Sequence, residues 1–178
     1  HASDPWVIRR DMQMLANAGV DFIYFDTTNA VLYPETVLAV CRMIAQMRKE
    51  GIAAPSICYT TYWNSGQAMN GAYDQIYSKN LFPEIWFRWE GKPLILGKAD
   101  DPKLRPEVKE FFTIKECWVG GGKPQKNKWN WLSLYPQGYG YSESPDVPEQ
   151  VSVTVAAHPE NPQGKVSITA SSLRSMKT

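Results

Sequence analysis

Hydrophobic positions in the first fifty residues follow helical and strand periods in turn. Between Asp4 and Gly19, apolar residues recur on one helical face, and Asp4 followed by proline is typical of a helix start. Residues 21–26, DFIYFD, are aromatic and β-branched, which predicts a strand. Residues 34–50 again have a helical apolar face, and Gly51 ends the predicted helix. The pattern therefore predicts a βα unit.

The alternation continues to residue 157. Further strands are predicted at 55–61, 93–97, 111–119, 129–135 and 151–157, with a weaker helix at 67–79 and a short one at 106–110. Strands separated by helical or loop crossovers predict a parallel sheet that is covered on both faces.

A closed barrel and an open doubly wound sheet both fit this alternation. No glycine-rich phosphate loop follows any predicted strand, whereas polar and aromatic residues follow several of them. This arrangement favours an α/β fold of the (β/α)8 TIM-barrel type over residues 1–165. Because a complete barrel needs about 250 residues and the chain has 178, we expect the barrel to be incomplete, without its first strand. Residues 166–178 are expected to form a C-terminal extension or a last strand.

The composition limits the classes of partner that we expect. The formal charge is +1, with 19 Lys and Arg against 18 Asp and Glu, so we do not expect the chain to bind nucleic acid. No apolar run approaches the ~20 residues that span a bilayer. The three cysteines match no metal or redox spacing, and the sequence predicts neither a metal site nor a cofactor. The first residues contain no Met and no signal-like apolar region, so we expect the true start to be missing.

In a barrel, chemistry occurs at the carboxyl ends of the strands, and this rule selects three candidate catalytic acids. Asp26 ends a predicted strand, although an Asp there also suits the cap of the following loop. Glu116 lies beside a tryptophan that would raise its pKa, with an ion pair to Lys115 or Lys98 as the structural alternative. Glu143 lies in a tyrosine-rich loop that would also suit an ordinary turn.

Aromatic and amide side chains near the same strand ends are candidates for stacking on a sugar and for hydrogen bonding to its hydroxyls. The candidate substrate-binding residues are Asn29, Tyr59, Tyr62, Trp63, Asn64, Trp118, Tyr135, Tyr139 and His158. A lone histidine is more often structural than functional, but the position of His158 at a predicted strand end makes the two roles about equally expected. Glu90 is excluded, because it precedes the strand at 93–97 and so belongs to the opposite end of the sheet.

Three segments resemble barrel glycoside hydrolases of families 71 and 99, especially uncharacterised bacterial relatives. The segments are DPWVIRRDMQMLANAGVDFIYFDTTNA, PEIWFRWEGKPLILG and PEQVSVTVAAHPENPQGK. The resemblance implies a (β/α)8 fold, hydrolysis of a glycosidic bond, a secreted or periplasmic location and no organic cofactor. Family 99 enzymes carry two closely spaced glutamates in a Trp-Glu-rich motif, and no segment of this chain matches it. Catalytic residues are therefore not carried over from the family.

The sequence thus predicts a glycoside hydrolase that acts on a neutral polysaccharide or glycan. Its catalytic groups would be carboxylates at the rim of the barrel, where the strands end. The alternative is a non-catalytic carbohydrate-binding barrel or an inactive fragment of such an enzyme. Two carboxylates ~5 Å apart would indicate a retaining enzyme, and a separation of ~6.5 to 9.5 Å an inverting one. A hydrolase for another substrate class would need a metal cluster, which the sequence does not indicate. The strands should be parallel, with Asp26, Trp63, Glu116 and His158 at one common end.

Overall fold

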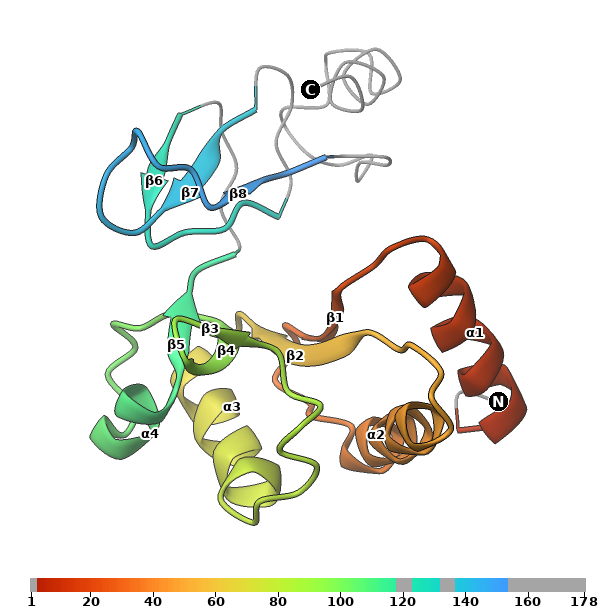
Figure 1. The fold of residues 1–178 in the computed structure, drawn as a ribbon. Helices are drawn as coiled ribbons and strands as arrows, with labels where there is room; N and C mark the ends of the chain where they lie inside the picture. Colours follow the sequence, from red (N-terminus) through yellow and green to blue (C-terminus); the bar gives the residue numbers. More distant parts are fainter. Residues whose placement is uncertain (1–2, 118–122, 132–136, 154–178) are drawn as a thin grey trace. The chain divides into compact units, whose positions relative to one another are not determined.

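The computed structural model describes residues 3–117, 123–131 and 137–153. The chain forms two compact units, His1–Ile114 and Lys115–Thr178 (Figure 1). The single barrel domain expected over residues 1–165 stays a prediction, and residues 166–178 lie outside the described residues.

The first half of the first unit follows the predicted alternation closely. Asp4 caps the first helix, where its carboxylate accepts a hydrogen bond of 2.9 Å from the backbone N–H of Trp6. Both predicted helices and both predicted strands form within a few residues of their expected bounds. In chain order they are α1 (Pro5–Asn17), β1 (Phe22–Thr27), α2 (Pro34–Lys49) and β2 (Ser56–Thr61).

The second half of this unit departs from the pattern at two places. The helix predicted at 67–79 is an α-helix that continues as a π-helical turn. The strand predicted at 111–119 is shorter, because Phe111 ends a helix and packs its ring 5.1 Å from that of Tyr73. The elements are α3 (Ser65–Ala72), η1 (Tyr73–Tyr77), β3 (Arg88–Trp89), β4 (Lys92–Leu96), α4 (Pro106–Phe111) and β5 (Thr113–Lys115).

The sheet of the first unit is mostly parallel and open. Its strand order is β1-β2-β4-β3, with β5 also paired to β4. The pairs β1–β2 and β2–β4 are parallel, as predicted. The strands β3 and β4 form an antiparallel hairpin, with Glu90 (φ 53°) and Gly91 (φ 81°) in the left-handed region that a two-residue hairpin turn requires. Glu90 thus precedes β4, as expected, and the described strands do not close into a barrel.

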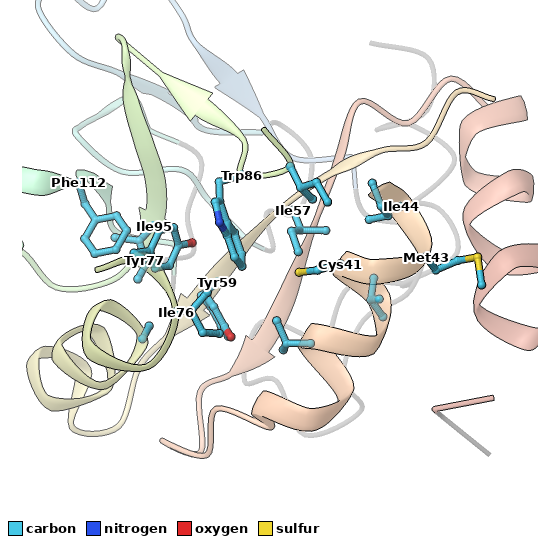
Figure 2. Packing of buried hydrophobic residues seen from close by; sticks show 14 of the residues in the cluster. Cys41, Met43, Ile44, Ile57, Tyr59, Ile76, Tyr77, Trp86, Ile95 and Phe112 are labelled. Carbon is cyan, nitrogen blue, oxygen red and sulfur yellow. The ribbon is translucent and has the colours of Figure 1, made fainter. Parts of the chain in front are cut away.

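All the helices that the structure describes pack on one face of this sheet. The parallel register points Ile23 and Phe25 of β1 to the same side as Ile57 and Tyr59 of β2. Side chains from α1, α2, α3, η1 and α4 join these residues in one hydrophobic cluster. Figure 2 shows part of it, with residues of α2 and η1 beside Ile57 and Tyr59. Figure 1 shows α2 and α3 on the same side of the strands.

The opposite face of the central strands is also buried. Cys58 and Thr60 of β2 alternate with the helix-facing residues, and both side chains are buried. Leu94 and Leu96 of β4 are buried as well. Such a continuous run of buried residues is typical of the central strands of a parallel sheet, whereas coverage of both faces stays a prediction.

The second unit contains short strands in a mixed sheet: β6 (Gln125–Lys126), β7 (Tyr139–Tyr141) and β8 (Gln150–Val151). The pair β6–β7 is parallel, whereas β7–β8 is antiparallel. The strand predicted at 151–157 begins in β8, so its expected parallel pairing is wrong at that residue. The connection at 142–149 is too short for a parallel crossover, which needs about a dozen residues. Residues 129–131 are outside any strand, and residues 132–135 and 154–157 lie outside the described residues.

Of the helices described in either unit, none has the length and apolar character needed to cross a membrane.

Candidate functional site

Hydrogen bonds join the carboxyl ends of the three parallel strands β1, β2 and β4. The backbone N–H of Trp63 donates to the carbonyl of Thr28 at 3.0 Å, which links the loops after β1 and β2. The hydroxyl of Thr61 donates to the carbonyl of Leu96 at 3.1 Å, which links the ends of β2 and β4. We call residues 26–29, 62–64 and 98 at these strand ends the rim.

Asp26 lies exposed at the end of β1, in register with Thr60 of β2. Its Oδ1 atom accepts hydrogen bonds from the backbone N–H of Thr28 at 3.0 Å and from the Thr28 hydroxyl at 2.7 Å. The carboxylate is therefore at the predicted strand end, and it also has the loop-capping geometry that the sequence left open as the alternative.

The loop after β1 is ordered by its own side chains. Asn29 donates from Nδ2 to the Tyr33 hydroxyl at 2.7 Å and accepts from the backbone N–H of Val31 at 3.0 Å. Ala30 and Tyr33 have positive φ angles of 64° and 48°, conformations that cost non-glycine residues about 1 kcal/mol or more. An open hollow of about 650 Å³ lies beside this loop, lined by residues 30–36 and Gln75.

The loop after β2 presents an aromatic pair at the rim. The side chain of Trp63 is 67% exposed, so core packing does not account for it. Its ring lies edge-on to that of Tyr62, with centroids 5.6 Å apart and an interplanar angle of 80°. Asn64 follows in the left-handed region (φ 46°) and starts α3. The exposed indole is a flat apolar surface of the kind that stacks on a sugar ring.

A buried polar cluster fixes the backbone below this pair. The hydroxyls of Thr61 and Ser65 lie 2.8 Å apart, and Ser65 Oγ accepts from the backbone N–H of Lys98 at 2.9 Å. A Cβ atom at Gly97 would lie 2.6 Å from Thr61 Oγ1, so only glycine fits there. The rim loops after β2 and β4 are thus held as one rigid support.

Lys98 is a rim residue that the sequence analysis did not select. Its Nζ atom lies 4.1 Å from the centroid of the Tyr62 ring, a cation–π contact. It follows the strand at 93–97, so the strand-end rule that selected Asp26 would also have selected it. Nearby Asp101 accepts from the backbone N–H of Gly66, and this hydrogen bond is the main reason why its pKa lies below the usual value.

Tyr59 does not reach the rim. Its side chain is fully buried on the helix-facing side of β2, and its ring stacks on that of Trp86 with centroids 6.1 Å apart. Burial raises the pKa of its hydroxyl. The structure therefore places this expected substrate-binding residue in the hydrophobic core (Figure 2), because the strand period points it away from Asp26.

The remaining described candidates lie in the second unit. Glu116 Oε2 forms an ion pair with Lys128 Nζ at 3.0 Å, a partner that the sequence did not suggest. Glu143 is exposed in the bend after β7, and the Tyr139 hydroxyl donates to a backbone carbonyl at 2.8 Å. Three expected binding residues, Trp118, Tyr135 and His158, lie outside the described residues.

A buried ion pair in the second unit was also missed by the sequence analysis. Lys115 Nζ lies 3.0 Å from Glu149 Oε2, and their side chains are 2% and 11% exposed. Lys115 also donates to the Ser142 hydroxyl, and the indole N–H of Trp129 donates to Glu149 at 3.1 Å. Burial alone would raise the pKa of Glu149, but hydrogen bonds from Ser142, Trp129 and Lys115 hold it below its usual value.

The first unit therefore brings together five predicted site residues at one end of its parallel strands: Asp26, Asn29, Tyr62, Trp63 and Asn64. The common end expected for Asp26 and Trp63 is confirmed, whereas that for Glu116 and His158 stays a prediction. Within the described segments, no group of three His, Cys, Asp or Glu side chains is placed to hold a metal ion.

No protein-family model matches the chain, and comparison with curated proteins and with solved structures gives no match either. The resemblance to glycoside hydrolases of families 71 and 99 stays a prediction from the sequence.

Proposed function

We propose that the chain is part of a secreted or periplasmic (β/α)8-barrel glycoside hydrolase that cleaves a polysaccharide or glycan at the rim. The observation that carries the proposal is the placement of the exposed Trp63 indole and the exposed Asp26 carboxylate on adjoining strand ends. The hydrogen bond between the Trp63 N–H and the Thr28 carbonyl keeps their loops together.

The barrel part of the proposal is supported by the topology of the first unit. The parallel strands β1, β2 and β4 lie side by side in the sheet in the same order as along the chain. The described helices pack on one face of this sheet. A doubly wound sheet instead reverses its strand order and has helices on both faces. In a barrel, helices cover the outer face, and chemistry occurs at the carboxyl ends of the strands.

The chemistry proposed for Asp26 follows from its contacts. Both hydrogen bonds from Thr28 go to Oδ1, which orients the carboxyl group while the described residues provide no partner for Oδ2. A sugar stacked on Trp63 would present hydroxyls or an anomeric carbon to that oxygen. Asp26 then acts as the nucleophile or as the general base. Alternatively, it accepts a hydrogen bond from a sugar hydroxyl, and this hydrogen bond becomes stronger in the oxocarbenium-like transition state.

The test is Asp26→Asn, screened for release of reducing ends from a panel of polysaccharides. We expect turnover to fall by at least ~10²-fold with an unchanged melting temperature, because the amide keeps the loop hydrogen bonds but not the charge. Asp21→Asn, an exposed acid just before β1, is the matched control and should remain active. Glu116→Gln and Glu143→Gln, measured in the same assay, test the second carboxylate. A stable Asp26→Asn variant with wild-type turnover would remove Asp26 from the catalytic set.

A second function, carbohydrate binding without catalysis, is favoured by the partners of the acids. Asp26 caps its own loop, and Glu116 is paired with Lys128. Both functions need the aromatic surface, so Trp63→Ala should abolish glycan binding in either case. Only the hydrolase predicts product release. Retention of a glycan that wild-type protein never cleaves would favour the binding function.

A further inference from the structure

Lys98 is a rim cation without a carboxylate partner among the residues that the structure describes. Three lysines elsewhere, Lys92, Lys115 and Lys128, each form an ion pair with a glutamate. Lys98 instead contacts the Tyr62 ring, with its Nζ atom 4.1 Å from the centroid. Stacking on an aromatic ring stabilises an ammonium group but leaves its charge available to a ligand.

Asp101, in the loop after β4, is close enough for the charge of Lys98 to contribute to its lowered pKa, but its carboxylate is held by backbone donors. Asp101 accepts hydrogen bonds from the backbone N–H groups of Gly66 and Lys103, the latter at 2.9 Å. The backbone of Lys98 itself is fixed by its hydrogen bond to the buried Ser65 hydroxyl. The position of the cation is therefore set by the fold.

The order of the strands separates this cation from Asp26. Asp26 lies at the end of β1 and Lys98 follows β4, with β2 and its Tyr62–Trp63 pair between them. Neighbouring strands are about 4.8 Å apart, so the two charges flank the aromatic pair about two strand spacings from each other. A ligand stacked on the pair can place one group toward Asp26 and another toward Lys98.

On the basis of the proposed function, we infer that the rim binds a glycan that carries an anionic substituent, a carboxylate or a sulfate. Trp63 stacks on the sugar ring and Lys98 pairs with the anion, on the side of the aromatic pair away from Asp26. This arrangement changes the substrate class from the neutral glycan expected from the sequence, because the sequence suggested Lys98 only as an ion-pair partner of Glu116 and not as a rim residue.

The test is affinity electrophoresis of the 178-residue chain in gels that contain a soluble polymer. The probes are polygalacturonate, its fully methyl-esterified form, dextran sulfate, dextran and poly-L-glutamate. We expect retardation by polygalacturonate, which carries only carboxylates, or by dextran sulfate, which carries only sulfates, and the one that retards identifies the anion. The methyl ester and dextran should bind more weakly, and added salt should weaken the acidic interaction. Trp63→Ala should abolish retardation.

Substitutions of Lys98 distinguish the loss of its positive charge from damage to the fold. Lys98→Met keeps the aliphatic stem and should weaken binding of the acidic polymer about fivefold, whereas Lys98→Arg should keep most of it. Lys79→Met removes an exposed charge that follows η1 and is the matched control, with no expected effect. Near-UV circular dichroism checks that each variant is folded.

The outcomes separate this inference from the proposed function. If each acidic polymer binds no better than its uncharged form, or if the Lys98→Met variant is unaffected, the anionic substrate class is overturned. Binding that still depends on Trp63 would in that case leave the proposed glycan site standing. Equal retardation by poly-L-glutamate overturns the inference as non-specific attraction of polyanions. Retardation by none of the polymers overturns both the inference and the proposed function.

Discussion

The two compact units of the chain are stabilised by different interactions. In the first unit, fully buried apolar side chains such as Ile57 and Ile95 lie between a parallel sheet and a layer of helices. In the second unit, the described strands are short, and Lys115 and Glu149 form a buried ion pair. Apolar burial is non-directional, whereas a buried ion pair stabilises only when its geometry and hydrogen bonds are intact. The second unit should therefore respond more sharply to changes of charge.

Buried polar atoms add to this contrast. In the second unit, both side-chain amide atoms of Asn130, which is 2% exposed, have no hydrogen-bond partner among the described residues, and neither has the hydroxyl of the buried Ser152. Each such group costs about 1 kcal/mol or more. In the first unit, the hydroxyls of Tyr59 and Tyr77 are in the same situation, but they lie within a much larger apolar cluster. We expect the second unit to unfold at the lower urea concentration.

Free cysteines provide a way to follow each unit. Cys41 lies in the first unit and Cys117 in the second, and both thiols are buried. A pulse of thiol reagent at increasing urea concentrations, followed by peptide mapping, reports the exposure of each cysteine. The predictions below use this assay to compare the units.

The largest effect is expected for Ile57→Ala in the centre of β2. The side chain is fully buried against the helices, so its truncation should cost about 4 kcal/mol through lost burial and a residual cavity. Cys41 should become reactive at a much lower urea concentration. Met14→Ala, at an exposed position of α1, is the control and should have little effect. An unchanged Cys41 midpoint would show that Ile57 is not in the stabilising core.

Lys115→Met should destabilise the second unit by about 3 kcal/mol. The substitution leaves the carboxylate of Glu149 buried without its cation, and the cost of such a charge is large. The midpoint for Cys117 should fall while that for Cys41 changes much less.

A double variant controls for the loss of packing. Lys115→Met combined with Glu149→Leu replaces the pair by apolar side chains and should recover at least half of the lost stability. If the double variant is as unstable as Lys115→Met alone, the ion pair is not the cause, and the contrast between the two units would not hold.

The structure of the first unit was largely predictable because its determinants are local. Asp4 capped α1 as predicted, and the apolar periods of α1, α2, β1 and β2 gave bounds within a few residues. The structure of the second unit was not predictable, because its strands are two or three residues long. A hydrophobic period cannot be recognised over so few positions, and the antiparallel return at 142–149 depends on tertiary pairing.

The candidate site residues also divide into those that local sequence patterns could predict and those that they could not. Position at a strand end placed Asp26 and Trp63 correctly at one end of the sheet, since both follow clear strand patterns. Tyr59 was misplaced because one step along a strand moves a side chain to the other face. The pair of Lys115 and Glu149 was missed because its members are 34 residues apart and no local pattern links them.

Asp101→Ala should have a smaller effect, about 1 kcal/mol, in the first unit. The carboxylate accepts from the backbone N–H of Gly66 near the start of α3, and loss of such a cap leaves that donor unsatisfied. We expect a modest fall in the Cys41 midpoint and weaker retardation by glycans, because α3 follows the Trp63 loop directly. Asp100→Ala, at an exposed neighbouring position, is the control. Equal effects of the two substitutions would exclude a capping role for Asp101.

The smallest effect is expected for acidification, and it tests both units at once. Glu149 and Asp101 have pKa values held below those of the unfolded chain, which are about 4.3 and 3.9. A lowered pKa means that the folded state binds protons less readily, so the contribution to stability is present above the unfolded pKa and is lost as the pH falls through the folded one. Between about pH 6 and about pH 3, the urea midpoints for Cys41 and Cys117 should therefore both fall, measured with 4,4′-dithiodipyridine, which reacts in acid. The double variant at Lys115 and Glu149 should flatten the Cys117 profile alone, and an unchanged profile would show that Glu149 does not set the acid sensitivity of the second unit.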